Sequence, residues 1–470
     1  MISSYSLDED ILLPVYKEYL IIFDKCEKIS DPYLNLMGLV FHEAMFITST
    51  FIYSQYWLDN IKEELKFPFL GYRNHKFSSL NKVSDFSIKR NLISKFNQII
   101  NKSNYTVGII NPSLDMNSLI RYLYKENLNF NFPQKASITI FNFKAQLDII
   151  TKSMESIWFK YNIKGDLNIF INAIKKSYNS LKEPLNIIMN YDVLLIGSPV
   201  KIPIRAEAAK ALANKIPVVC IDHGNETGTA NHPYWGYDEQ SYCSHFVGYG
   251  SKGKIAIKKN NYLKSLFSKN PAYIESNSNF ILNNYKEKEI KKITKPLSEI
   301  KLAYIPSALM GVKRLGPYNS ISDQNYIEWQ KYLFNSFRNL VYKAHPKQKI
   351  DIPLKNIEII NIPLEKCINK YDCFITDMIS TTAFSNLAIS NKPIIYFNIG
   401  FGKLTKEAER VVKDRVLWIN INIDDPGDIY QKVEARRNKK FINNYTRNFS
   451  LTNSKDSREK TVVDLLKSFV

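Results

Sequence analysis

The chain has 470 residues, more than one ordinary hydrophobic core accommodates, and this length suits two domains of about two hundred residues each. Hydrophobic residues make up 45% of the sequence and aromatic residues 13%, which excludes a disordered chain. The formal net charge of +19 favours an anionic partner such as a nucleotide, an acidic sugar, a phospholipid surface or a nucleic acid, although a base-composition bias toward Lys, Asn and Ile explains it equally well.

The cysteines and the amino terminus indicate a cytoplasmic protein. The five cysteines are scattered without a C-x-x-C pair, as expected of reduced thiols. Residues 1–13 carry acids where a secretory leader needs bases. The most apolar early segment, 36–58, contains Glu43, and a carboxylate within a spanning helix costs a few kcal/mol. We therefore expect a buried amphipathic helix there, and at most a peripheral contact with the inner face of the cytoplasmic membrane.

The first part of the chain, 1–270, is predicted to form one α/β domain with a helical region over 8–66, where apolar residues return every three or four positions. Short apolar runs then alternate with helical patterns, as in a parallel sheet with crossover helices. The expected strands are 105–113, 136–143, 191–199, 216–224 and 245–250, and the expected helices between them are 114–127, a region reaching about 185, and 204–215.

The strand at 216–224 ends in Asp222, His223 and Gly224, and a polar loop follows it. Two glycines in this region, Gly224 and Gly228, would let the backbone approach a ligand closely. Catalysis by a base or a nucleophile requires an imidazole or a carboxylate beside the reacting atom. The candidates here are Asp222, His223, Glu226, Asp238 and Glu239, with Gly224 as a candidate substrate contact.

Residues 271–298 are rich in Asn, Lys and Ser and are predicted to be the linker to a second α/β domain, 299–470. Its first strand is followed by a basic loop whose candidate contacts to an anionic sugar or phosphate are Lys313, Arg314 and Tyr318; an exposed basic loop is the alternative interpretation. The further elements expected in this domain are a helix at 325–337, strands at 340–346, 371–377 and 392–401, a helix at 378–391 and a last helix at 456–470.

Polar residues follow two of these strands where each strand ends. In an open parallel sheet a ligand binds outside the carboxyl ends of the strands, and a helix that begins there offers backbone N–H groups to an anion. We therefore predict a site for the phosphate of a nucleotide. Its candidate residues are Lys343, His345, Pro346, Asp377, Ser380, Thr381 and Thr382. Asp377 is expected to cap or orient the helix after it rather than to react.

Other motifs are weaker. Gly248, Gly250 and Gly253 match G-x-G-x-x-G, but Ile255 stands where a P-loop needs Ser or Thr, and the residues after it do not open a convincing helix. The sequence contains no H-E-x-x-H and no D-x-D at a strand end, so we expect neither a metal nor another cofactor. The aromatic residues lie in apolar segments rather than within a basic patch, which argues against the alternative of a nucleic-acid-binding protein.

The order K-x-H-P at Lys343–Pro346, then about thirty residues, then T-D-x-x-S-T and K-P-I-I resembles a group of bacterial surface-polysaccharide transferases. That group includes sialyltransferases, Kdo transferases and CDP-glycerol polymerases. The resemblance implies the GT-B architecture, two Rossmann-like domains facing across a cleft, here with an amino-terminal helical extension. It also implies that His345-Pro346 and Ser380 with Thr381 hold the phosphate of a CMP- or CDP-activated donor.

The similarity is greatest to the retaining β-Kdo transferase branch, through G-P-Y and Y-x-x-W-Q at 316–330, and it extends over about 190–402. These enzymes use an aspartate nucleophile, for which Asp222 and Asp238 are the candidates. The resemblance thus implies transfer of an acidic sugar, Kdo or a relative, from a CMP donor to a glycan or glycolipid acceptor of the O-antigen or capsule type. A CDP-polyol phosphotransferase is the alternative enzyme, although the P-L-K that normally follows its H-G-T is missing here.

Overall fold

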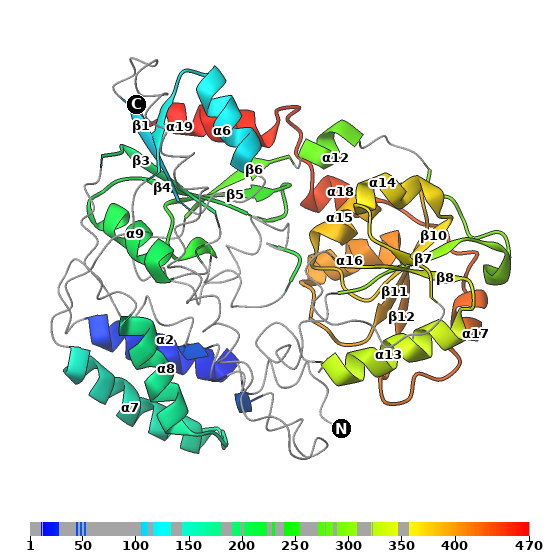
Figure 1. Ribbon diagram of the computed structural model, residues 1–470, viewed down its shortest axis with the longest axis horizontal. Coiled ribbons are helices and arrows are strands. Elements are labelled where there is room, and N and C mark those ends of the chain that lie inside the picture. The colour runs from blue at the N-terminus through cyan, green and yellow to red at the C-terminus, as the bar shows by residue number, and fades with distance from the viewer. Residues whose placement is uncertain are drawn as a thin grey trace.

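The computed structural model describes most of the chain between residues 105 and 469 and a few segments before it (Figure 1). The described residues are 11, 13–27, 44–45, 48, 51–52, 105–110, 116–132, 143–179, 190–197, 199, 202–222, 228–230, 239–253, 271–277, 279–284, 289–307, 321, 323–345 and 357–469. They form two lobes, each built around a parallel six-stranded sheet. We call the lobe with the earlier strands the first domain and the other the second domain.

The first sheet has the strand order β2-β1-β3-β4-β5-β6, and every neighbouring pair is parallel. Its strands are β1 (Thr106–Ile110), β2 (Asn129–Asn131), β3 (Val193–Ile196), β4 (Val218–Ile221), β5 (His245–Tyr249) and β6 (Ala272–Ser276). The central strands read VLLI and VVCI and are buried throughout, because helices cover both faces of a parallel sheet.

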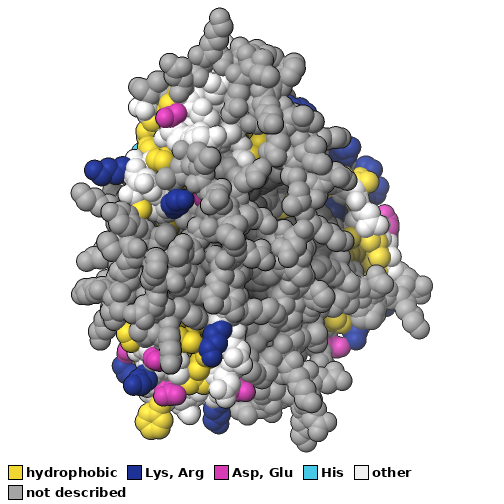
Figure 2. Space-filling model, turned by 60° about the vertical axis from the view of Figure 1, so that its left-hand side comes forward, with side chains coloured by type: hydrophobic (Ala, Val, Ile, Leu, Met, Phe, Trp, Pro, Cys, Tyr) yellow, Lys and Arg dark blue, Asp and Glu magenta, His cyan; other side chains and the backbone are white. Residues whose placement is uncertain are grey.

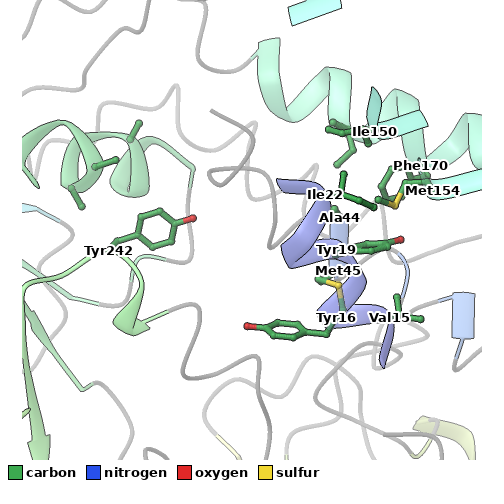
Figure 3. Close-up of a cluster of buried hydrophobic side chains, with 14 of the residues drawn as sticks. Val15, Tyr16, Tyr19, Ile22, Ala44, Met45, Ile150, Met154, Phe170 and Tyr242 are labelled. Carbon is green, nitrogen blue, oxygen red and sulfur yellow. The ribbon is translucent and has the colours of Figure 1, made fainter. Parts of the chain in front are cut away.

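A helical layer covers one face of the first sheet. Its helices are α2 (Leu13–Glu27), α7 (Phe143–Lys160), α8 (Leu167–Asn179) and α9 (Ile202–Ala213). Figure 3 shows Tyr19, Met154 and Phe170, from α2, α7 and α8, within one cluster of buried side chains. Trp158 Nε1 donates to the Tyr19 hydroxyl at 2.9 Å, and that hydroxyl lies 2.5 Å from the hydroxyl of Thr48. These bonds satisfy the polar atoms that the aromatic side chains bring into the core.

The second sheet has the order β12-β11-β10-β7-β8-β9 and is also fully parallel. Its strands are β7 (Leu302–Ile305), β8 (Leu340–Lys343), β9 (Ile359–Ile360), β10 (Cys373–Thr376), β11 (Ile394–Asn398) and β12 (Leu417–Asn420). Numbered within the domain, this is the doubly wound order 3-2-1-4-5-6, which reverses between β7 and β10. The two sheets confirm the predicted α/β fold of GT-B type with two Rossmann-like domains.

The helices of the second domain follow the same alternation. They are α13 (Asp323–Ser336), α14 (Leu364–Cys367), α15 (Thr382–Ala388), α16 (Lys406–Arg415), α17 (Ile429–Glu434) and α18 (Asn444–Phe449), with short 3-10 turns η3 (Leu297–Glu299) and η4 (Ile368–Lys370). Helix α13 covers one face of the sheet, where Tyr326, Trp329 and Leu333 join one core cluster. On the other face α14, α15, α16 and α18 share a second cluster. This two-sided burial explains the uninterrupted apolar strands.

The chain returns to the first domain after α18. Helix α19 (Arg458–Lys467) lies beside α6 (Met116–Lys125) on the first sheet (Figure 1). Val462, Val463 and Leu466 are buried there among residues of β1, β3 and β4. The sequence predicts this helix as the last element of the second domain, but its apolar stripe completes the core of the first, on the sheet face opposite the helical layer.

Two strands differ from the expected segments because their residues are polar. β6, read AYIES, lies within the predicted linker but pairs with β5 as the outer strand of the first sheet. β2, read NFN, pairs with β1. The strand expected at 136–143 falls largely outside the described residues, and Phe143 begins α7. Helix α12 (Asn279–Asn284) follows β6, so the crossing to the second domain comes after it.

In the described part of the chain, no helix is long and apolar enough to cross a membrane. Figure 2 shows one face of the molecule, on which described basic, acidic and hydrophobic side chains are interspersed. The positive net charge of the sequence is therefore not gathered into a single patch among the described residues of that face.

Glu207 on α9 provides a pH test of the first-domain core. Its buried carboxylate accepts from the Tyr191 hydroxyl at 2.5 Å, and burial raises its pKa above the ordinary 4.5 despite the opposing effects of Tyr191 and Lys210. Above pH 4.5 the folded state therefore holds more protons at Glu207 than the unfolded state does. The free energy of unfolding consequently falls as the pH rises. We expect Glu207→Gln to gain stability relative to the wild type between pH 4.5 and 7, measured by urea unfolding. A pH-independent difference would contradict this.

Candidate functional site

The carboxyl edge of the second sheet brings together the strand ends that the sequence predicts to bind phosphate. His345 follows β8 and Ser380 follows β10, and both strands pair in parallel with β7. Since neighbouring strands lie about 4.8 Å apart, the ends of β8 and β10 are roughly 10 Å apart on one edge. The order of strands reverses between β7 and β10, the position at which doubly wound sheets bind ligands.

The hydroxyl groups after β10 begin a short helix. Thr381 is the N-cap of α15, and its side chain accepts from the backbone N–H of Phe384 at 3.1 Å. Ser380 is half-buried and Thr382 is exposed. Because Thr381 already serves as the cap, its hydroxyl is oriented toward the helix.

Asp377 is fully buried and connects three elements of the second domain. Its carboxylate accepts from the hydroxyl of Tyr304 on β7, from the hydroxyl of Tyr326 at 3.0 Å and from Nε1 of Trp329 at 3.1 Å, both on α13. The Tyr326 hydroxyl also accepts from the backbone N–H of Ser307, two residues beyond β7, at 2.9 Å. Burial, and next the nearby Asp377 carboxylate, raise the pKa of Tyr304 well above its ordinary value.

This network clarifies what Asp377 does. Asp377 is one of the predicted nucleotide contacts, with capping or orienting the following helix as its expected role. In the structure its carboxylate bonds to side chains of β7 and α13 and so holds both against β10. Tyr326 and Trp329 are the Y and W of the Y-x-x-W-Q segment, so two motifs of the resemblance meet in one hydrogen-bonded cluster. The only indication of this cluster in the sequence is a pair of aromatic residues three positions apart on a predicted helix. That spacing is equally typical of an ordinary core.

Lys343 lies on the opposite face of the second sheet from Asp377. Its ammonium donates to the carbonyl of Ala344 at 2.7 Å, and the residue is only 6% exposed. Burial lowers the pKa of Lys343, while Cys367 and Glu365 oppose that shift. The ammonium is therefore placed among α14 side chains beneath the sheet edge, and phosphate contact would require it to turn outward.

In the first domain, two of the five candidate catalytic residues are described, and both are buried. Asp222 directly follows β4 and is 1% exposed; Glu239 precedes β5 and is 3% exposed. Burial raises the pKa of the Cys220 thiol, and Cys243, Glu239 and Asp222 add to that shift. Neither carboxylate is open to a substrate in this arrangement. The other candidates of both domains that lie outside the described residues are His223, Gly224, Glu226, Asp238, Lys313, Arg314, Tyr318 and Pro346.

The three glycines of G-x-G-x-x-G have packing roles. A Cβ at Gly248 or Gly253 would lie 2.5 or 2.0 Å from the Tyr273 hydroxyl. Gly250 has φ +67° and would place a Cβ 2.6 Å from the carbonyl oxygen of Asn448 in the second domain. The Tyr273 ring and the domain contact thus require these glycines, which removes the reason to infer a dinucleotide site from them.

The loops after β4 and β5 touch the second domain. Ala230 and Leu404 form an isolated antiparallel bridge, and Thr405 bonds to the 228–229 backbone. The backbone N–H of Lys252 donates to the Asn448 carbonyl at 3.0 Å. The carboxyl edge of the first sheet therefore faces the second domain. Among the described residues, no group of three or more His, Cys, Asp or Glu side chains could hold a metal ion.

No protein-family model matches the chain, and no curated protein sequence matches it significantly. Among solved structures, the glycosyltransferase SnogD from Streptomyces nogalater is 10% identical, with 78% of this chain and 100% of that chain covered and a TM-score of 0.35. The glycotransferase of kitacinnamycin is 10% identical, with 78% and 94% covered and a TM-score of 0.31. UDP-GlcNAc 2-epimerase from Neisseria meningitidis, bound to UDP-GlcNAc, is 12% identical, with 77% and 99% covered and a TM-score of 0.35. The two-domain architecture rests on the two parallel sheets themselves.

Proposed function

We propose that the protein is a glycosyltransferase that moves an acidic sugar, Kdo or a related ulosonic acid, from a CMP-sugar donor to a bacterial surface polysaccharide. The observation that carries the proposal is the order of the second sheet: it reverses between β7 and β10, and His345 and Ser380 follow the two strands on either side of β7. The sequence resemblance supplies the chemical class of donor. The acceptor is a glycan or glycolipid at the inner face of the cytoplasmic membrane.

The residues at this edge have the chemistry that a leaving nucleotide phosphate requires. His345, when protonated, donates a charge-assisted hydrogen bond to a phosphate oxygen, and the hydroxyls of Ser380 and Thr382 donate two neutral ones. Such donors stabilise negative charge that develops on the leaving group, the role that a divalent metal has in other transferases. The basic loop residues Lys313, Arg314 and Tyr318 are assigned to the acidic sugar.

A carboxylate or an imidazole must also act at the sugar or the acceptor. In an inverting transferase it removes the proton of the acceptor hydroxyl; in a retaining enzyme it attacks the anomeric carbon. Asp222 and Asp238 were the candidate nucleophiles, and the burial of Asp222 favours Asp238. His223 and Glu226, which follow β4 within four residues of Asp222, are the candidates for general base.

Nucleotide binding tests the proposal. We expect CMP to bind the wild type in isothermal titration calorimetry and UMP or duplex DNA to bind much more weakly. His345→Ala should weaken CMP binding by about 10- to 100-fold, because a hydrogen bond to a charged group contributes about 1.5–3 kcal/mol. The matched control is His245→Ala, which removes a half-buried histidine at the amino end of β5 and should leave the affinity for CMP unchanged. Equal affinities of all three proteins for CMP would refute the site.

Donor specificity distinguishes the two enzyme classes. Incubation with CMP-Kdo and a glycan acceptor should release CMP. Incubation with CDP-glycerol in place of CMP-Kdo should release no CMP. The reverse result would favour the polyol phosphotransferase. The anomeric configuration of the product, determined by NMR, then shows whether the sugar is transferred with retention or inversion.

A further inference from the structure

We propose that Glu365 determines the base specificity of the nucleotide site by accepting a hydrogen bond from the exocyclic amine of cytosine. The inference deepens the proposed function and rests on it for the location of the nucleotide phosphate. Glu365 lies in the first turn of α14, the helix that follows the outer strand β9. The residue is exposed, so a ligand can reach its carboxylate.

Helices α14 and α15 cover the same face of the second sheet, next to each other in Figure 1. Leu364 of α14 and Phe384 of α15 belong to one core cluster with Ile305 of β7. Strand β7 lies between β8 and β10, the strands that precede His345 and Ser380. The two helices therefore pack together against the strand that separates these candidate phosphate contacts.

A buried amide fixes the Glu365 carboxylate between the two helices. Nδ2 of Asn386 on α15 donates to Glu365 Oε1 at 2.9 Å, and Asn386 is only 7% exposed. Asn386 comes four residues after Thr382, so the two side chains lie on one face of α15, one turn apart. Thr382 is exposed and is a candidate phosphate contact. The carboxylate and this hydroxyl thus share the side of α15 that meets α14.

The end of β8 presents His345 to the same face of the sheet. Val341 on β8 packs against the α14–α15 cluster, and the side chains of a strand alternate between the two faces. The pairing extends to Ala344, whose N–H donates to a β9 carbonyl at 3.0 Å. Alternation therefore places the side chains of Lys343 and His345 on the side of the sheet that carries Glu365.

The opposite face is filled by α13 at this edge. Tyr326 and Trp329 of α13 bond to the buried Asp377 carboxylate, and the Tyr326 ring packs edge-on against Phe401 with 4.8 Å between ring centroids. A nucleoside whose phosphate contacts His345 and the hydroxyls after β10 therefore extends along α14 and α15, toward the Glu365 carboxylate.

A carboxylate beside a phosphate site requires a donor in the ligand. Its negative charge repels the phosphate unless another group of the same ligand attracts it. Carboxylates of Glu and Asp accept from the exocyclic amine of cytosine in protein–nucleic acid recognition. Uracil carries a carbonyl oxygen at that position, and a carboxylate repels it. Glu365 thereby provides a physical reason for the expected preference for CMP over UMP.

The test measures the affinities of the full chain for CMP, UMP and 2′-deoxy-CMP by isothermal titration calorimetry. In Glu365→Gln the side-chain carbonyl retains the bond from Asn386, and the amide replaces Oε2, so a donor faces the base. We expect the affinities for CMP and 2′-deoxy-CMP to fall about 10-fold, because a charged acceptor is lost. The affinity for UMP should stay within about 2-fold or rise, since the amide can donate to uracil.

The matched control is Glu358→Gln, which changes an exposed glutamate that precedes β9 and should leave all three affinities unchanged. Two results would overturn the inference while the proposed function stands. One is an unchanged affinity of Glu365→Gln for CMP. The other is an equal loss for CMP and UMP, which indicates a contact to the ribose if 2′-deoxy-CMP loses nothing and a general effect if it loses as much. Failure of the wild type to bind CMP refutes the proposed function itself, and the inference with it.

Discussion

Replacing Asp377 with alanine is expected to lower the free energy of unfolding by roughly 2–6 kcal/mol. Three buried donors lose this acceptor, but the Tyr304 and Tyr326 hydroxyls lie 3.0 Å apart and one can still donate to the other, which leaves two lost bonds at about 1–3 kcal/mol each. The donors are the hydroxyls of Tyr304 and Tyr326 and Nε1 of Trp329. Urea unfolding monitored by tryptophan fluorescence measures the effect, since Trp329 is itself part of the cluster. The backbone at Ser307, where the loop after β7 starts, should also become more accessible to solvent in the variant. The reason is that the Tyr326 hydroxyl would no longer be held in position to accept from the Ser307 N–H.

The matched control lies at the other end of the same strand. Asp372 precedes β10, is exposed, and accepts from the backbone N–H of Lys301 at 2.9 Å. Asp372→Ala should cost at most about 1 kcal/mol, because water can replace an exposed hydrogen bond. If both aspartate variants lost the same stability, the three-donor network around Asp377 would not be the reason.

The substitution Val463→Asp is expected to prevent stable folding of the first domain. Val463 is fully buried on α19 among β1, β3 and β4 residues. The change loses about 1.5–3 kcal/mol of apolar burial and places a carboxylate without a partner in that core, which adds several kcal/mol more. The sum approaches the total stability of a typical domain. Limited proteolysis with mass spectrometry should show cleavage within residues 105–250 of the variant at protease concentrations that leave the wild type intact.

A surface change on the same helix provides the control. Lys460 pairs with Asp464 at 2.5 Å, and both side chains are exposed. Lys460→Ala should change stability by at most about 0.5 kcal/mol, as expected of an exposed pair four residues apart. Wild-type resistance of Val463→Asp to proteolysis would show that α19 does not complete the core of the first domain.

The sequence predicts the central strands of both sheets because burial on two faces requires continuous apolar runs. VLLI, VVCI, LAYI and CFIT are such runs, and each is a strand. The outer strands do not share this signal. β2 and β6 contain Asn, Glu and Ser, and their pairing depends on a neighbouring strand rather than on their own composition. Such strands can be recognised only from their pairing in the folded sheet.

Candidate-site residues divide in the same way. His345 and Ser380 could be assigned to one edge from the sequence, since parallel strands end on the same side of a sheet. The link from Asp377 to Tyr326 and the link from Thr405 to Gly228 could not, because the partners are 51 and 177 residues apart and carry no local pattern. Burial of Asp222 and Lys343 likewise depends on elements that meet only in the folded chain.

The return of α19 to the first sheet has a consequence for biosynthesis. Roughly 190 residues separate the end of β6 from Leu466, and at about 5–20 residues per second a ribosome needs roughly 10–40 s to make them. During that interval the valine and isoleucine side chains of β1, β3 and β4 that Val462, Val463 and Leu466 later cover stay open to solvent or to a chaperone. The first domain is thus translated first but is the last to complete its hydrophobic core.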